Sequence, residues 1–257
     1  MKVSQLRPNK EVAGYVDRVL VIEYHELDVP FSLPLFANGT PTLLFTSIKG
    51  KMGNDTLAYL TLFGQTILPA TLTNAEGFQL IAYFFKPWAL HTIFGIAAPE
   101  LTDNPSYLGL LPLKGVKELE ERLLNATTSD SRITLIDNYM AKLATSAYPD
   151  NRILQHSLCR IAQAPSSTIL RELHKELHLT ERTFHRMFEK NVGLSPGLYR
   201  RIHQFHIAFQ QLNSRNFDKL SDIAFRNGYA DQSHYIRTFK EFTDLTPKEY
   251  INYGSRS

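Results

Sequence analysis

The sequence contains one cysteine, Cys159, and one tryptophan, Trp88. A single cysteine excludes an internal disulfide framework and any zinc site built from several thiolates. No stretch reaches the roughly 18 consecutive apolar residues that a membrane-spanning helix needs. The first eight residues lack the apolar run of a signal peptide. These absences predict a cytoplasmic protein without disulfide bonds and without a membrane partner.

Motifs of the common enzyme classes are also missing. The sequence has no P-loop, no Gly-rich dinucleotide fingerprint and no G-x-S-x-G elbow. Histidine is scarce in residues 1–149, where only His25 and His91 occur, the first of them near Glu23 and Glu26. Glu23 and His25 would share one face of a strand, but His91 falls in another element. We therefore expect no catalytic site, no metal and no cofactor.

Charge is distributed unevenly along the chain, although the net charge is only +3. Residues 1–149 contain 12 Lys and Arg against 14 Asp and Glu, whereas residues 150–257 contain 16 against 11. Seven of the nine histidines also lie in the second part. A basic half is typical of a surface that meets a polyanion such as DNA. A basic surface exposed only to solvent is the alternative.

The first part of the chain, to about residue 112, has the pattern of an antiparallel β-domain. Runs of β-branched and aromatic residues alternate with turn formers, and they cover residues 19–24, 42–46, 57–63 and 79–85. Many short strands with such punctuation predict a barrel or a sandwich. Helical patterns follow, at about 88–94, 118–124 and 131–143.

Turn formers cluster at residues 146–150 and predict a domain boundary there. The expected fold class is α+β. Residues 1–148 would form a β-rich sensor or dimerisation domain that ends in two helices. Residues 149–257 would form an all-α domain.

The all-α part contains an internal repeat. At an offset of 51, residues 179–190 align with 230–241, which places Arg186 on Arg237. Upstream the offset becomes 50 and places His178 on Gly228, as a one-residue difference in a turn would produce. Each copy therefore predicts a helix, a short turn and a second helix.

The second helix of each copy is expected to have an apolar inner face and a polar outer face. The inner faces contain Phe184, Met187, Phe188 and Asn191 in the first copy and Tyr235, Thr238, Phe239 and Phe242 in the second. Exposed Arg and Gln suit a helix in the major groove, because they bind guanine and adenine through paired hydrogen bonds. A helix over residues 196–212, about 25 Å long, would hold the two helices roughly one DNA turn apart.

Residues of about 166–252 resemble the double helix-turn-helix domain of the AraC/XylS family of transcription regulators. The second copy carries most of the resemblance, through Ile223-Ala224, Gly228-Tyr229, Ser233, Tyr235, Arg237, Phe239-Lys240, Thr246-Pro247 and Tyr250. The first copy departs at His174 and His178, where the family usually has Ala and Gly. Glycine suits a turn with positive φ best, so it stays open whether both units read bases or only the second.

The N-terminal part resembles the cupin-like, β-rich sensor domain that precedes some such DNA-binding domains. Residues 34–45 and Gly64-Gln65 carry this resemblance. It implies effector binding, dimerisation or both. The implied partners are double-stranded DNA, RNA polymerase, a small-molecule effector and a second copy of the chain.

The resemblance also places base-reading residues early in each recognition helix. They are Arg182, His185 and Arg186 in the first helix, and Gln232, Ser233, Ile236 and Arg237 in the second. Lys190, Lys240 and Lys248 are the expected phosphate contacts. As an alternative, Arg186 and Arg237 contact phosphate or pair within the fold, which would add little specificity.

The expected function is sequence-specific DNA binding that regulates transcription, with activation and repression both open. Three alternatives remain at this point. The N-terminal domain could serve dimerisation alone. The chain could be a β-barrel enzyme with a DNA-binding tail. It could also be a protein-interaction adaptor that no longer binds DNA.

Overall fold

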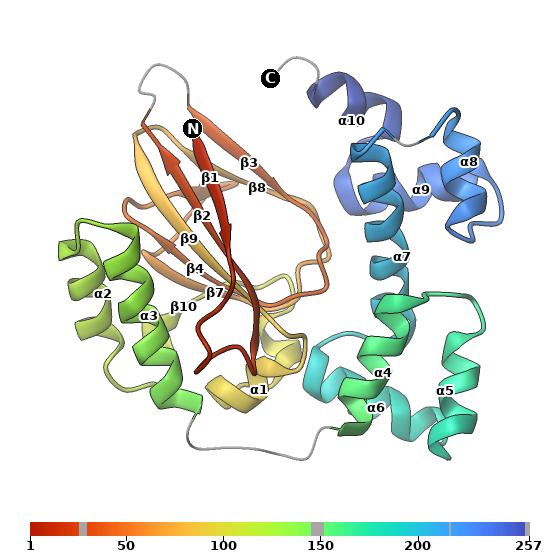
Figure 1. Ribbon diagram of the computed structural model, residues 1–257, viewed down its shortest axis with the longest axis horizontal. Coiled ribbons are helices and arrows are strands. Elements are labelled where there is room, and N and C mark those ends of the chain that lie inside the picture. The colour runs from red at the N-terminus through yellow and green to blue at the C-terminus, as the bar shows by residue number, and fades with distance from the viewer. Residues whose placement is uncertain (26–29, 145–151, 216, 255–257) are drawn as a thin grey trace.

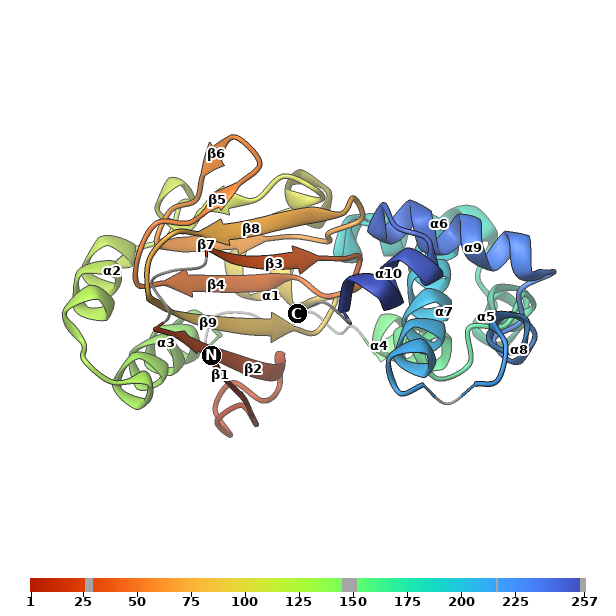
Figure 2. The ribbon, with the colours of Figure 1, turned by 90° about the horizontal axis from the view of Figure 1, so that it is seen from above.

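The computed structural model describes residues 1–25, 30–144, 152–215 and 217–254. A β-rich half and an all-α half lie side by side (Figures 1 and 2). The predicted boundary at residues 148 and 149 falls outside the described residues. Within those residues, no helix is long and apolar enough to cross a membrane.

The β-rich half consists of two antiparallel sheets, which confirms the predicted fold class. The larger sheet has the order β1 (Lys2–Leu6), β2 (Val16–Tyr24), β9 (Phe78–Phe85), β4 (Thr42–Thr46), β7 (Leu60–Phe63) and β10 (Ser106–Tyr107). The smaller sheet has the order β3 (Phe31–Leu35), β8 (Ala70–Asn74), β5 (Lys51–Met52) and β6 (Asp55–Thr56). The expected strands at 19–24, 42–46 and 79–85 are present, and the run at 57–63 forms a strand only from Leu60.

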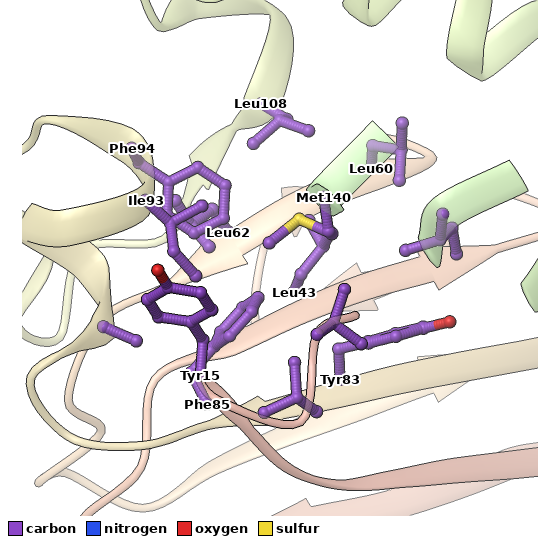
Figure 3. Packing of buried hydrophobic residues seen from close by; sticks show 14 of the residues in the cluster. Tyr15, Leu43, Leu60, Leu62, Tyr83, Phe85, Ile93, Phe94, Leu108 and Met140 are labelled. Atoms are coloured by element: carbon purple, nitrogen blue, oxygen red, sulfur yellow. The ribbon is translucent and has the colours of Figure 1, made fainter. Parts of the chain in front are cut away.

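Both faces of the larger sheet are buried at its strands β9, β4 and β7. Successive side chains of a strand point to opposite faces, so Leu80 and Ala82 of β9 face the smaller sheet while Ile81 and Tyr83 face the helices. Figure 3 shows the helix-facing core, in which Tyr83 and Phe85 lie near Met140. Because apolar side chains cover both faces, β9 reads as a continuous apolar run rather than an alternating one.

Helices cover the outer face of the larger sheet. They are α1 (Ala89–Phe94), α2 (Val116–Asn125) and α3 (Ser129–Ala144), with the 3₁₀ helices η1 (Ala98–Leu101) and η2 (Leu108–Leu110) between them. The three predicted helices are thereby confirmed. The hydroxyl of Tyr83 donates to Oδ1 of Asp137 at 2.9 Å and ties α3 to β9. Burial raises the pKa of the Asp137 carboxyl, partly offset by this hydrogen bond.

The second half contains seven helices among the described residues. They are α4 (Arg152–Gln163), α5 (Ile169–Leu177), α6 (Glu181–Val192), α7 (Pro196–Asn213), α8 (Leu220–Arg226), α9 (Gln232–Thr243) and α10 (Pro247–Gly254). The predicted linker helix is confirmed as α7, with 18 residues. Ser195 caps it by accepting from the Leu198 N–H at 3.2 Å, and Pro196 occupies its first turn.

Two of the contacts between the halves lie near α7 and near η1. In the first, Ala37 is buried in the core of the all-α half and the Phe36 ring lies 5.7 Å from that of Phe209 on α7. In the second, Oγ1 of Thr102, next to η1, donates to the carbonyl oxygen of Gly193 at 3.1 Å. A Cβ on Gly193 would lie 2.9 Å from the Ala98 carbonyl oxygen, so the backbones approach too closely for any larger residue.

Candidate nucleic-acid interface

The predicted repeat folds into two helix-turn-helix units. Helices α5 and α6 form the first unit, and α8 and α9 form the second. His178 adopts the left-handed conformation in the first turn with φ of 52°, and Gly228 does so in the second with φ of 71°. The first turn therefore forms despite its histidine, although an L-residue is strained in this conformation.

The helix ends repeat as well. Thr180 caps α6 by accepting from the Thr183 N–H at 3.3 Å, and Asp231 caps α9 by accepting from the His234 N–H at 2.7 Å. After the second unit, Thr246 and Glu249 cap each other at the start of α10, with the Thr246 N–H donating to Glu249 Oε2 at 2.7 Å. These caps fix where α6 and α9 begin, and so which side chains their first turns present.

The apolar faces of α6 and α9 lie inward, as predicted. Phe184 and Phe188 are fully buried, as are Tyr235 and Phe239. Their rings belong to one aromatic cluster that continues into α7 through Phe205, whose ring lies 5.6 Å from that of Phe239. This packing anchors each helix and leaves its opposite face to solvent.

The predicted DNA-contacting residues lie on the outer faces. Those exposed to solvent are Arg182, Arg186, Lys190, Gln232, Ser233, Arg237, Lys240 and Lys248. Ile236 and His185 are half-exposed, and Nε2 of His185 lies 3.9 Å from Glu181 Oε1. Among the described residues, neither Arg186 nor Arg237 forms an ion pair with a carboxylate. Their guanidinium groups are therefore available to an external acceptor.

A polar network holds α4 against α5, beyond what the repeat predicted. Nε2 of His156 lies 2.7 Å from Oε1 of Glu176, and Nη1 of Arg160 donates to its Oε2 at 2.6 Å. The His156 hydrogen bond and the Arg160 charge lower the pKa of the Glu176 carboxyl. The repeat could not predict this contact, because α4 precedes the repeated region.

A cavity of about 260 Å³ lies at the junction of the two halves. Its walls include Leu44, Leu72, Leu80 and Ala82 from the two sheets and Phe205, His206 and Phe209 from α7. The guanidinium of Arg18, at the cavity, lies 4.2 Å from the centre of the Phe84 ring. No local sequence signal could reveal this site, because its residues extend along the chain from Arg18 to Phe209.

Two histidines of α7 face the β-rich half. Burial lowers the pKa of His203 to about 4, and His206 adds to the effect. Burial also lowers the pKa of His206, opposed by a hydrogen bond with the Ala37 backbone. Both imidazoles are therefore neutral at pH 7, and Arg18 is the cation at the cavity. Within the described ranges, no three His, Cys, Asp or Glu side chains group closely enough to hold a metal.

Comparison with known families matches both parts of the chain. Residues 173–253 match a family described as a helix-turn-helix domain. Residues 4–106 match a family described as "Domain of unknown function (DUF6597)". The chain is 26% identical over 183 residues to an uncharacterised HTH-type transcriptional regulator, YtdP, of Bacillus subtilis. That alignment covers 69% of this chain but only 22% of the relative, so the chain spans about a fifth of its length.

Solved structures show the same fold. The crystal structure of ToxT from Vibrio cholerae O395 aligns with a TM-score of 0.50 at 11% identity, over 91% of this chain and 96% of ToxT. ToxT bound to (E)-4-(8-methylnaphthalen-1-yl)but-3-enoic acid also aligns with a TM-score of 0.50, at 12% identity, over 91% and 98% of the two chains.

The fold and these matches define a protein with an N-terminal β-rich half and a C-terminal double helix-turn-helix domain. Through the helix-turn-helix domain they relate it to a transcription regulator. The resemblance to the AraC/XylS family is confirmed, and the C-terminal part of the chain is a helix-turn-helix domain of the AraC type.

Proposed function

We propose that this chain binds a specific sequence of double-stranded DNA and thereby regulates transcription. The recognition helices α6 and α9 enter successive turns of the major groove. Arg182, Arg186, Gln232 and Arg237 contact base edges, helped by His185, Ser233 and Ile236, and Lys190, Lys240 and Lys248 contact phosphates. Bound in this way, the protein positions or excludes RNA polymerase.

One observation carries this proposal. Both recognition helices bury aromatic side chains inward and expose an arginine at the position that the repeat makes equivalent, Arg186 in α6 and Arg237 in α9. Arg can bind guanine O6 and N7 through two hydrogen bonds and so distinguish guanine from the other bases. Contacts to phosphate alone carry no such sequence information. A purely structural repeat would have no reason to repeat an exposed, unpaired arginine.

We further propose that the cavity binds a small effector, with apolar atoms among the sheets and an acidic group near Arg18. The lining is almost wholly apolar, and Arg18 lies at it with the two neutral histidines of α7 beside the same junction. ToxT, which shares the fold, has been crystallised with an aromatic butenoic acid. Phe205 and Phe209 of α7 line the cavity. A bound effector would therefore contact the helix that joins the two helix-turn-helix units.

Selection of bound duplexes from a random pool tests the DNA proposal, followed by a salt titration on the enriched sequence. We expect a motif with two elements about ten base pairs apart, centre to centre. A single short element would show that only one unit reads bases. Weak binding that depends steeply on salt, with no enriched sequence, would contradict sequence-specific regulation.

Thermal unfolding across a panel of apolar carboxylic acids tests the effector proposal. A true ligand stabilises the folded state by mass action, by about 2.7 kcal/mol at a hundred times its dissociation constant. If no acid stabilises the chain, the N-terminal half has another role. Dimerisation is the second candidate, because the edge strand β1 exposes Val3 and Leu6 and pairs only with β2 among the described strands. Sedimentation analysis would detect such a dimer.

A further inference from the structure

A line of hydrogen bonds runs along one face of the linker helix α7. Nη1 of Arg200 donates to the carbonyl oxygen of Pro165 at 3.1 Å and to Oε1 of Gln204 at 3.2 Å. Nε2 of Gln204 donates to the carbonyl oxygen of Asn227 at 2.8 Å. Nδ2 of Asn227 donates to Oε1 of Gln211 at 2.8 Å, which returns the line to α7.

The line links the segment just before the first helix-turn-helix unit with the turn of the second unit. Pro165 lies in the loop between α4 and α5, just before the first unit. Asn227 ends α8, at the turn that leads to α9 in the second unit. Arg200, Gln204 and Gln211 are spaced by four and seven residues and therefore share one face of α7. The line thus connects the start of one unit with the turn of the other.

The donors and acceptors along the line match without conflict. One guanidinium nitrogen carries two hydrogens, so Arg200 Nη1 can donate to both Pro165 and Gln204. The Gln204 amide then has one usable orientation, because its oxygen must face Arg200 and its nitrogen must face Asn227. Nδ2 of Asn227 likewise divides its two hydrogens between Gln211 and the carbonyl oxygen of Ile223, which lies at 2.8 Å.

Burial makes the line sensitive to the loss of any member. Gln204 is only 6% exposed, and burial lowers the pKa of the Arg200 guanidinium. Water cannot readily replace a lost partner at such a site, so an unmatched group there is costly. Apolar packing around α7 resists separation of the units, whereas directional hydrogen bonds also resist their rotation.

We propose that Arg200, Gln204 and Asn227 are positioning residues that fix the orientation of α6 relative to α9. They thereby set the separation of the two DNA elements that the chain accepts. The second statement rests on the proposed function, while the first concerns the protein alone. One added base pair rotates the second element by about 35° around the duplex, so a rigid pair of reading helices must discriminate between spacings.

Distance measurement between two spin labels tests the positioning without DNA. The labels are placed on outward positions of α6 and α9, by Glu189→Cys and Lys240→Cys in a Cys159→Ser background. Gln204→Met keeps the side-chain length but removes both hydrogen bonds. Gln210→Met on the exposed face of α7 is the matched control. We expect one narrow distance distribution for the parent and for the control, and one at least twice as broad for Gln204→Met.

An equally narrow distribution in Gln204→Met would overturn the proposal, whether or not the chain binds DNA. If that variant does not fold, Arg200→Lys replaces it, because lysine keeps the charge but cannot reach both acceptors in the same geometry. With the selected DNA, elements moved by one base pair should weaken parent binding at least tenfold and Gln204→Met binding less than threefold. A parent that selects no sequence contradicts the DNA proposal alone, because the label distances still report the positioning.

Discussion

Thr102 and Gly193 join the two halves of the chain through one hydrogen bond. Oγ1 of Thr102 donates to the Gly193 carbonyl oxygen at 3.1 Å, and Gly193 ends the first recognition helix with φ of 83°. The chain runs on for only two residues before α7 begins at Pro196. A shift of η1 in the β-rich half would therefore reach the C-terminal end of α6 directly, without first passing through the cavity.

Thr102→Val tests this contact. Valine keeps the shape of threonine but leaves the Gly193 carbonyl without its donor, at a cost of about 1 kcal/mol. We expect faster amide exchange in the last turn of α6 and a lower unfolding temperature. Thr102→Ser retains the hydroxyl and should match the parent in both measurements. Equal exchange in the valine and serine variants would show that packing alone holds the two halves together.

The repeat could be predicted from the sequence because its signals are local. Apolar spacing, turn residues and capping residues recur at offsets of 50 and 51, and they produced the correct helices and inward faces. The strands missed by the sequence analysis lack such signals. In β1 every side chain is at least partly exposed, and β3 contains Pro34, which counts against a strand.

The cavity and the line along α7 could not be predicted for a different reason. Phe205 and Phe209 mark an apolar face of a helix, but nothing in the sequence says that part of this face closes the end of two sheets. Gln204 reads as a polar residue on a helix, where exposure is the usual outcome. Its burial depends on Arg200 and Asn227, which only the tertiary fold brings together.

His178→Gly should stabilise the first helix-turn-helix unit. His178 is held at φ of 52°, a conformation that costs an L-residue roughly 1–2 kcal/mol and glycine almost nothing. Part of this gain is offset by the greater freedom of glycine in the unfolded chain, which leaves about 0.5–1 kcal/mol. Urea unfolding measures the difference. His178→Ala removes the same side chain but keeps the backbone strain, so a gain of equal size in that variant would contradict the explanation.

Asp137→Asn should change how stability depends on pH. The pKa of Asp137 is raised in the folded protein, so the folded state favours the protonated carboxyl. The stability that Asp137 contributes to the folded state is fully present at pH below the ordinary aspartate pKa. It is lost as pH rises through the raised pKa. Asparagine stays neutral and can still accept from Tyr83, so the variant should gain stability relative to the parent as pH rises through this window and hold that gain above it.

Urea unfolding at a series of pH values measures this effect. The matched control is Asp55→Asn, at an exposed position in the short β6 strand. For Asp55→Asn, the difference from the parent in free energy of unfolding should not change with pH across the same window. A flat difference for Asp137→Asn as well would show that Asp137 has the same pKa in the folded and unfolded chain.

Ala82→Leu should block the cavity without disrupting the sheet. Ala82 lies on the central strand β9 and lines the cavity, so a larger apolar side chain has space to enter. Without ligand, the free energy of unfolding of the variant should lie within about 1.5 kcal/mol of the parent value. An acid that stabilises the parent should not stabilise the variant. Arg18→Gln leaves the cavity open. It should weaken the binding of acids but not the binding of neutral apolar analogues. If Ala82→Leu still responds to the acid, the ligand binds elsewhere.

The exposed arginines and lysines of the recognition helices should differ in what they contribute to DNA binding. Replacing Arg186 or Arg237 by alanine should weaken binding to the selected sequence by about 1–3 kcal/mol and relax the preference at one base position. Replacing Lys190 or Lys240 by alanine should weaken binding to all sequences alike. It should also reduce the steepness of log affinity against log salt concentration by about one. Fluorescence anisotropy over a salt series, with the selected and a scrambled duplex, separates these results. If the arginine variants behave as the lysine variants do, the arginines contact phosphate, and sequence must be read by Gln232 and its neighbours at the start of α9.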